Sequence, residues 1–124
     1  MLIEQSLTER IVGLAIEVHR ITGRGLLESV YERCLCYELQ KVGLPFERQV
    51  GIPVMYEGLI LDEGFRADIV VDRKVILEIK AVAAILPAHE AQLQTYLCMS
   101  GIPVGLILNF NASRLIDGLR RFVV

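Results

Sequence analysis

The sequence of 124 residues predicts an α/β domain in which helices flank a mixed β-sheet. Two amphipathic helical patterns come first, and short apolar runs typical of strands follow. Residues 66–81 read as an antiparallel hairpin, whereas residues 75–110 read as strand, helix, strand. Such a unit joins parallel strands by a right-handed crossover, so the sheet contains both kinds of pairing. The length suits one domain over residues 1–124.

Two helices are expected before the first strand. The first begins with a capping-box pattern at residues 6–9 and ends at Gly23, a residue typical of helix C-termini. The second spans about residues 26–42 and is closed by Gly43. Apolar residues at helical spacing predict the buried face of the second helix. This face is expected to contain Leu27, Val30, Tyr31, Cys34, Leu35 and Val42.

The middle and end of the chain supply the strands. Alternation over residues 49–56 predicts a half-buried strand, and Pro53 places it at a sheet edge because proline cannot donate to a ladder. A turn at residues 57–58 leads into a second short apolar run. Pro87 marks the start of a helix over residues 88–100, and residues 103–110 read as a buried central strand. The tail, residues 114–124, is expected to form a last strand.

The hairpin at residues 66–81 carries three charged residues inside apolar runs, namely Asp68, Glu78 and Lys80. Glu78 and Lys80 are two residues apart, so they point to the same face of a strand. A turn of three residues, 72–74, places Asp68 opposite Glu78, whereas a turn of two would send the carboxylates to opposite faces. Buried charges are costly unless paired or metal-bound. The pattern therefore predicts either a metal site with a catalytic lysine or a buried salt bridge of Lys80.

These residues resemble the signature of the PD-(D/E)XK nuclease superfamily, an acidic residue on one strand followed by Glu-x-Lys on the next. Asp68 and residues 78–80 match it, and Ala67 stands where the signature often has proline. The resemblance implies a restriction-endonuclease-like core with the element order αβββαβ. It also implies that Asp68, Glu78 and Lys80 are catalytic. Asp68, Glu78 and the Ile79 carbonyl would bind Mg²⁺ or Mn²⁺, the ions that hard oxygen ligands suit.

The segment at residues 25–31 reads Gly-x-x-Glu-x-x-Tyr and resembles the signature of the GxxExxY family, which is placed in the same superfamily. In that superfamily a glutamate of the first helix often completes the metal site, which implies this role for Glu28. The alternative for Glu28 is an acidic residue that the helix dipole favours. Glu38 competes with it by helical spacing, or it pairs with Lys41 or Arg33. His19 is more typical of a packed or hydrogen-bonded residue than of a ligand.

On the helix after Pro87, Gln92 and Tyr96 form a Gln-x-x-x-Tyr pattern. It resembles a motif of the RecB-like branch of these nucleases, in which the pair contacts the substrate backbone. The resemblance implies that Gln92 and Tyr96 bind substrate. The alternatives are solvation for Gln92 and core packing for Tyr96.

Composition narrows the class of protein. Hydrophobic residues make up 53% of the chain, yet the uncharged stretch 91–110 contains glutamine, asparagine, glycine and proline, so no membrane span is expected. The apolar content is instead expected to supply a buried sheet and a homodimer surface. Three cysteines without metal-site spacing indicate reduced thiols in a cytoplasmic protein. A net charge of −2 argues against a broad basic surface for nucleic acid.

Together the patterns favour a metal-dependent nuclease that hydrolyses phosphodiester bonds in DNA or RNA. All the catalytic residue types are present, which supports this function. The acidic balance and the small size favour two alternatives, a non-catalytic nucleic-acid-binding module and a protein-interaction module that retains the fold. Dimerisation would join two clefts and enlarge the surface available to a nucleic acid.

Overall fold

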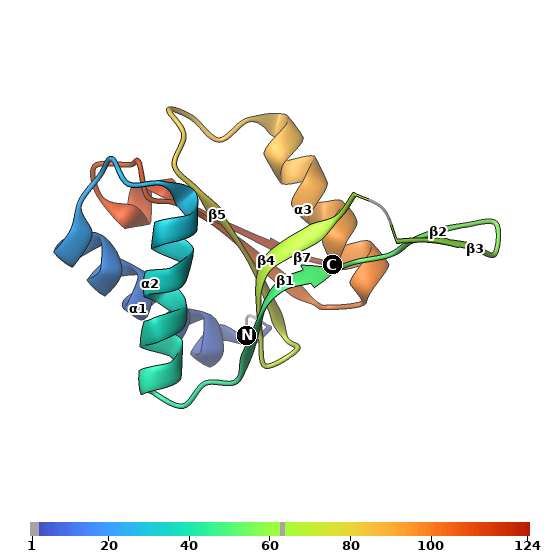
Figure 1. Ribbon diagram of the computed structural model, residues 1–124, viewed down its shortest axis with the longest axis horizontal. Coiled ribbons are helices and arrows are strands. Elements are labelled where there is room, and N and C mark those ends of the chain that lie inside the picture. Colours follow the sequence, from blue (N-terminus) through green and yellow to red (C-terminus); the bar gives the residue numbers. More distant parts are fainter. Residues whose placement is uncertain (1–2, 63) are drawn as a thin grey trace.

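A computed structural model describes residues 3–62 and 64–124 and shows a five-stranded mixed sheet between helices (Figure 1). The strand order is β1-β4-β5-β6-β7, in which β5 and β6 are parallel and the other neighbours antiparallel. This arrangement confirms the mixed sheet predicted from the sequence. The strands are β1 (Phe46–Gly51), β4 (Arg66–Val71), β5 (Val75–Lys80), β6 (Val104–Asn109) and β7 (Leu119–Val123).

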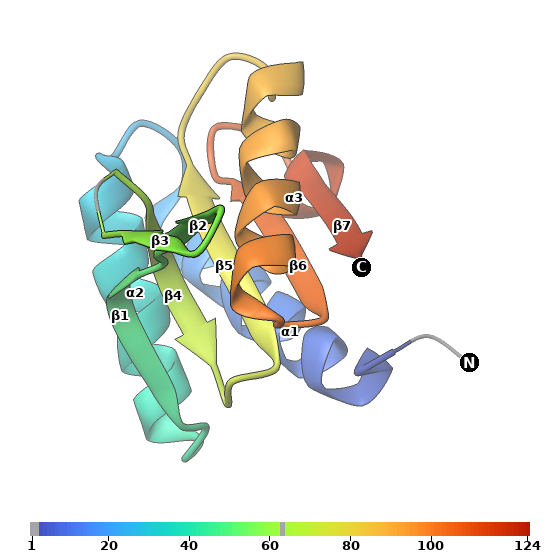
Figure 2. The same cartoon turned by 90° about the vertical axis from the view of Figure 1, so that its right-hand side faces the viewer.

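Helices cover both faces of this sheet. On one face lie α1 (Gln5–Thr22) and α2 (Glu28–Lys41), and on the other lies α3 (Pro87–Ser100), in front of the sheet in Figure 2. Leu77 of β5 belongs to the core cluster of α1 and α2, whereas the adjacent Ile76 belongs to the cluster of α3. Burial on both faces explains why the central strands read as continuous apolar runs.

The start of α1 differs from the prediction. The helix begins at Gln5, after Glu4 as the N-cap residue, and no side chain caps it. The Thr8 hydroxyl donates to the Gln5 carbonyl at 3.0 Å, inside the first turn. The capping-box prediction at residues 6–9 was therefore wrong, because these residues already belong to the helix. Gly23 ends the helix as predicted, with φ 70° and its N–H bonded to the carbonyl of His19.

The buried face of α2 was predicted only in part. Leu27 is 72% exposed and Val42 is 43% exposed, because they are the residues that cap the two helix ends and do not follow helical spacing. Val30, also predicted as buried, is 39% exposed. The face that packs on the sheet consists of residues four apart on the helix, together with the residue that follows two of them. Its buried members are Tyr31, Glu32, Leu35, Cys36 and Leu39.

The strand expected at residues 49–56 is two strands. β1 ends at Gly51, and beyond Pro53 the chain forms a separate two-stranded sheet of β2 (Val54–Tyr56) and β3 (Leu59–Leu61), which projects from the body (Figure 1). Pro53 lacks the N–H that would continue the ladder, so the single strand was wrong, although the edge position of β1 was right. The turn at residues 57–58 is as predicted, with both residues at positive φ.

The C-terminal tail forms a short 3₁₀ helix, η1 (Leu115–Gly118), and then β7, which pairs with β6 as the predicted last strand. A Cβ on Gly118 would lie 2.4 Å from the Asn109 carbonyl oxygen, so only glycine fits this approach. Within the part of the chain that the structure describes, none of the helices combines the length and the hydrophobicity needed to cross a bilayer.

Candidate active site

The paired part of the β4–β5 hairpin has the predicted register. Val71 pairs with Val75 across the three-residue turn 72–74, and the pairing continues to Ile69 opposite Leu77. The next residues along the two strands are Asp68 and Glu78. The odd turn length therefore brings these two carboxylates to opposing positions, as the sequence predicts.

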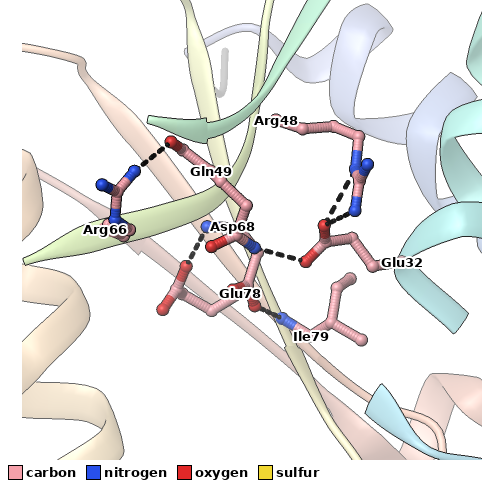
Figure 3. A network of polar contacts seen from close by, with 7 residues as sticks. All are labelled: Glu32, Arg48, Gln49, Arg66, Asp68, Glu78 and Ile79. Carbon is pink, nitrogen blue, oxygen red and sulfur yellow. Dashed lines mark hydrogen bonds and ion pairs between the residues drawn. The ribbon is translucent and has the colours of Figure 1, made fainter. Parts of the chain in front are cut away.

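At Asp68 and Glu78 the two strands separate, and the carboxylates take over as hydrogen-bond partners. The main-chain N–H of Asp68 donates to Glu78 Oε2 at 2.9 Å, and that of Ile79 donates to Asp68 Oδ2 at 2.7 Å (Figure 3). The N–H of Ile79 faces β4, so Asp68 Oδ2 lies in the gap between the two strands. The N–H of Asp68, which Glu78 Oε2 accepts, alternates with those of Ile69 and Val71 and faces the β1 side of β4. We call this opening, formed by Asp68, Glu78 and Ile79, the fork.

The fork has more negative charge than its surroundings balance. Glu78 is 4% exposed, and burial, followed by the nearby Asp68 carboxylate, raises the pKa of Glu78 to about 8. Burial also raises the pKa of Asp68, against the lowering effect of the Ile79 N–H. Near neutral pH the protein without a bound cation therefore keeps a proton on Glu78 much of the time. A cation in the fork would relieve both effects.

Lys80 lies two residues beyond Glu78 at the end of β5, where it is half-buried. Its charge lowers the pKa of Glu78 and of Asp68. Among residues 3–62 and 64–124, however, no carboxylate oxygen lies within 4.0 Å of its ammonium group. The geometry therefore does not contain the salt bridge that was the alternative explanation for Lys80.

Glu28, the first residue of α2, reaches the same end of β5. Its Oε2 accepts a hydrogen bond at 3.0 Å from the main-chain N–H of Ala81, the residue after Lys80. A hollow of about 510 Å³ separates α2 from the fork. It is lined by Leu27, Glu28, Ser29, Glu32, Gln49 and Asp68. The structure thus brings Glu28 near the site but engages it with the main chain.

The tyrosine of the Gly-x-x-Glu-x-x-Tyr segment has a structural role. The buried Tyr31 hydroxyl donates to the Gly23 carbonyl at 2.6 Å and accepts the Leu26 N–H at 3.2 Å, while its ring stacks on Phe110. Gly25, at φ 98°, supplies a left-handed conformation in the same loop. The two motif residues therefore shape the loop that delivers Glu28 to β5.

Glu32 was not among the predicted site residues, although it is 4% exposed and faces the fork from α2. It accepts hydrogen bonds from Arg48 and Gln49 of β1 (Figure 3). Glu32 lies four residues after Glu28, so helical spacing from the predicted ligand could have found it. Glu38, which was considered instead, pairs with Lys41 at 3.2 Å, one of the two partners expected for it.

The two predicted substrate-binding residues lie on α3. Tyr96 is 3% exposed and packs edge-on against Phe65, with ring centroids 5.3 Å apart. Burial, with the charges of Glu78 and Asp68, raises the pKa of Tyr96 to about 12, whereas the half-buried Gln92 acts in the opposite direction. Tyr96 is therefore a core residue close to the fork, and Gln92 borders it on the solvent side.

His19 lies apart from this site and has the structural role that its position in the sequence suggests. Its Nε2 is 3.0 Å from the Ala112 carbonyl oxygen, and its ring packs against Phe110. It therefore links α1 to the loop that follows β6.

The fork suits an ion that needs few protein ligands. Among the residues that the structure describes, no three Asp, Glu, His or Cys side chains gather in a geometry that could hold a metal ion. Magnesium, however, commonly binds through one or two carboxylates and keeps several waters. Asp68 and Glu78 provide two carboxylates, whose oxygens are hard donors and whose negative charges a bound cation would neutralise. The donor set therefore fits Mg²⁺ or Mn²⁺ with two carboxylates, and Glu28 would have to leave Ala81 to become a third.

Comparison with known families and structures agrees with this geometry. The model of the PD-(D/E)XK nuclease superfamily matches residues 5–122, which include every residue of the fork. The crystal structure of a protein called SSO0001 is similar over 98% of this chain and 78% of that chain, with a TM-score of 0.53 and 16% sequence identity. At this identity the similarity shows a restriction-endonuclease-like fold and nothing finer. Among curated proteins no match was found.

Proposed function

Because this chain belongs to the PD-(D/E)XK nuclease superfamily, we propose that it is a metal-dependent nuclease that hydrolyses phosphodiester bonds of DNA or RNA. The fork is the observation that carries this proposal. Because the pKa values of Asp68 and Glu78 are raised, a bound cation would stabilise their charged forms. Lys80 lies beside them without a carboxylate partner within 4.0 Å among the described residues. Within the superfamily we assign the chain to the GxxExxY family and the RecB-like branch, on the motifs of α2 and α3.

Each residue near the fork has a proposed role. Asp68, Glu78 and the Ile79 carbonyl would hold Mg²⁺ or Mn²⁺, with Glu28 as a further ligand once it releases Ala81. The bound ion would supply charge stabilisation at the phosphate and lower the pKa of a coordinated water. The Lys80 ammonium orients the attacking water and neutralises charge that develops on the phosphate. Of the two predicted substrate-binding residues, the half-buried Gln92 would contact the substrate backbone beside the site, and the buried Tyr96 would support Gln92 from the core.

A protein-interaction module is the second candidate, and the β2–β3 hairpin favours it. Met55, Tyr56, Leu59 and Ile60 are 51–62% exposed on this projecting hairpin, which carries little charge. Exposed apolar side chains of this kind are typical of interaction surfaces. On the same ground we propose that the protein forms a homodimer. The free thiols of Cys34, Cys36 and Cys98 support a reducing, cytoplasmic setting.

Metal binding and cleavage measured on the same preparation test the proposal. Calorimetric titration with Mn²⁺ should show binding to the wild type that Asp68→Ala abolishes. Wild-type protein should then cleave at least one of single-stranded, duplex and branched DNA or RNA with Mg²⁺ or Mn²⁺, and none with EDTA. Metal binding without cleavage of any of these substrates would favour a non-catalytic nucleic-acid-binding module. Absence of metal binding would refute the proposed site.

A further inference from the structure

The edge strand β1 is interrupted opposite the fork. It pairs with β4 on both sides of Gln49, but Gln49 and the residue across from it, Asp68, are skipped. Gln49 adopts the left-handed conformation, with φ 51°, although it is not glycine. Left-handed residues other than glycine are strained and persist only where their surroundings hold them. A specific set of contacts must therefore keep Gln49 in this conformation.

The buried carboxylate of Glu32 provides those contacts. Gln49 Nε2 donates to Glu32 Oε1 at 2.8 Å, and Arg48 donates to Glu32 Oε2 through Nε at 3.0 Å and Nη2 at 2.7 Å (Figure 3). The main chain of Gln49 is held as well, since its carbonyl accepts a hydrogen bond from Arg66 Nη1 at 3.0 Å. Gln49 is thus fixed from α2 through its side chain and from β4 through its carbonyl.

The interruption leaves Asp68 without a ladder partner on either side. Pairing with β5 stops one residue before it, and pairing with β1 skips it. Its N–H and its carboxylate are therefore available to Glu78 and Ile79, the contacts that make the fork. A regular β1 would continue its ladder through this position and align the main chain of Asp68 with the edge strand. The break at Gln49 and the fork at Asp68 are two sides of one local arrangement.

We propose that Glu32 is a positioning residue that fixes Asp68 in the fork by holding Gln49 in the left-handed conformation. Glu32 acts through Gln49 and Arg48 and does not bind the ion itself. Its two oxygens already accept three hydrogen bonds, and Arg48 balances its charge. This role does not depend on any ligand. Its consequence for metal affinity rests on the proposed function.

Two substitutions of the exposed Gln49 separate its conformation from its side-chain contact. Gln49→Gly and Gln49→Ala both remove the amide that reaches Glu32, but only glycine adopts positive φ without strain. The fork should therefore open in Gln49→Ala and stay close to the wild type in Gln49→Gly. Glu32→Gln should open it as well, and Glu32→Gln combined with Gln49→Gly should restore it. A merely structural ion pair would not show this rescue.

Amide hydrogen exchange reads the fork directly without metal. In Gln49→Ala and Glu32→Gln, the N–H groups of Asp68 and Ile79 should exchange ~10-fold faster relative to Ile107 of the central strand β6, which reports global unfolding. Manganese affinity measured by calorimetry should weaken in the same order, by ~10-fold, as for other residues that orient metal ligands. Because Gln49 is exposed, its variants keep the test open if Glu32→Gln does not fold.

Three results decide the matter. If Asp68 and Ile79 follow Ile107 in every variant, Glu32 only stabilises the core and the positioning role is refuted. The same conclusion follows if Gln49→Gly opens the fork as much as Gln49→Ala. If the fork amides respond as expected while the wild type binds no Mn²⁺, Glu32 keeps its positioning role and the proposed nuclease function fails instead.

Discussion

The two halves of the β4–β5 hairpin differ in what holds them. Near the turn, Val71 and Val75 are fully buried, pair through the main chain and pack against α1 and α2. At the fork, main-chain pairing between β4 and β5 gives way to bonds between N–H groups and the carboxylates of Asp68 and Glu78, and the pKa of each carboxylate is raised. One hairpin thus has an apolar half, which ends at the last paired residues of β4 and β5, and an acidic half, which begins at the next residue of each strand.

This difference shows where a small domain can contain buried carboxylates that lower its folding stability. Carboxylates whose pKa is raised by burial disfavour the folded state as the pH rises. Their position where β4 and β5 separate leaves room for an ion and keeps the β4–β5 ladder intact over residues 69–71 and 75–77. The apolar half then supplies the hydrophobic stabilisation that the acidic half lacks. Substitutions in the two halves should therefore change different properties.

The largest effect on stability is expected at Leu77, the last paired residue before the fork. It is fully buried, so Leu77→Ala should lower the free energy of unfolding by about 2–5 kcal/mol. Urea unfolding measures the loss, and the exposed Leu59→Ala in the β2–β3 hairpin is the control, expected to change it by about 0.5 kcal/mol or less. Metal affinity per folded molecule should not change. A large loss of metal affinity in folded Leu77→Ala would show that the two halves are coupled.

Lys80 tests the other half. Lys80→Ala should slow cleavage by ~10²–10³, the usual cost of losing one preorganised electrostatic contact, while the melting temperature stays near that of the wild type. Lys74→Ala is the matched control, because Lys74 lies 51% exposed at the turn of the same hairpin. It should leave the rate unchanged. If Lys80→Ala instead destabilised the protein and kept its cleavage rate per folded molecule, the lysine would be structural.

Glu78 predicts a pH effect on stability without metal. Its pKa is about 8 in the folded chain and close to the ordinary 4.5 when unfolded, so between these values only the folded state keeps the proton. The stabilisation is complete below about pH 4.5 and is lost as the pH rises to about 8. In EDTA the melting temperature of the wild type should fall across this window more than that of Glu78→Gln. Glu47→Gln, exposed on β1, should behave as the wild type.

Manganese provides the check on this titration. Because an ion that binds the folded state competes with the proton on Glu78, millimolar Mn²⁺ should raise the melting temperature more at pH 8 than at pH 5. The Glu78→Gln variant should lose most of this gain. An equal gain at both pH values would contradict the assignment of the raised pKa to the metal-binding carboxylate.

The apolar half of the hairpin could be predicted from the sequence. The alternation of strand side chains and the odd turn length at residues 72–74 sufficed to place Val71 opposite Val75. The predicted pairing does not extend to Asp68 and Glu78, where the two strands separate. Pro53 predicted that the strand over residues 49–56 lies at a sheet edge, but not that the strand breaks there. The absent proline N–H ends β1, but the separate β2–β3 sheet depends on contacts that local sequence does not contain.

The support of the acidic half could not be predicted in the same way. Glu32 meets Arg48 and Gln49 across 16 and 17 residues, and the left-handed Gln49 has no local sequence signal, since glycine is the usual residue there. The face of α2 was misjudged because Leu27 and Val42 lie outside the helix. The first error concerns long-range packing, which overrides local pattern. The second concerns helix ends, which sequence patterns place only to within a few residues.

Tyr31 gives the smallest expected effect and tests how α2 reaches the acidic half. Tyr31→Phe keeps the ring stacked on Phe110 but removes the hydroxyl that bonds Gly23 and Leu26, so stability should fall by about 1 kcal/mol. Tyr37→Phe, on the same helix and 62% exposed, should change nothing. If the hydroxyl fixes the loop before Glu28, the Ala81 N–H should also exchange faster in Tyr31→Phe, whereas amides near the turn of the hairpin should not. Unchanged exchange at Ala81 would mean that the backbone of this loop places Glu28 without help from the tyrosine hydroxyl.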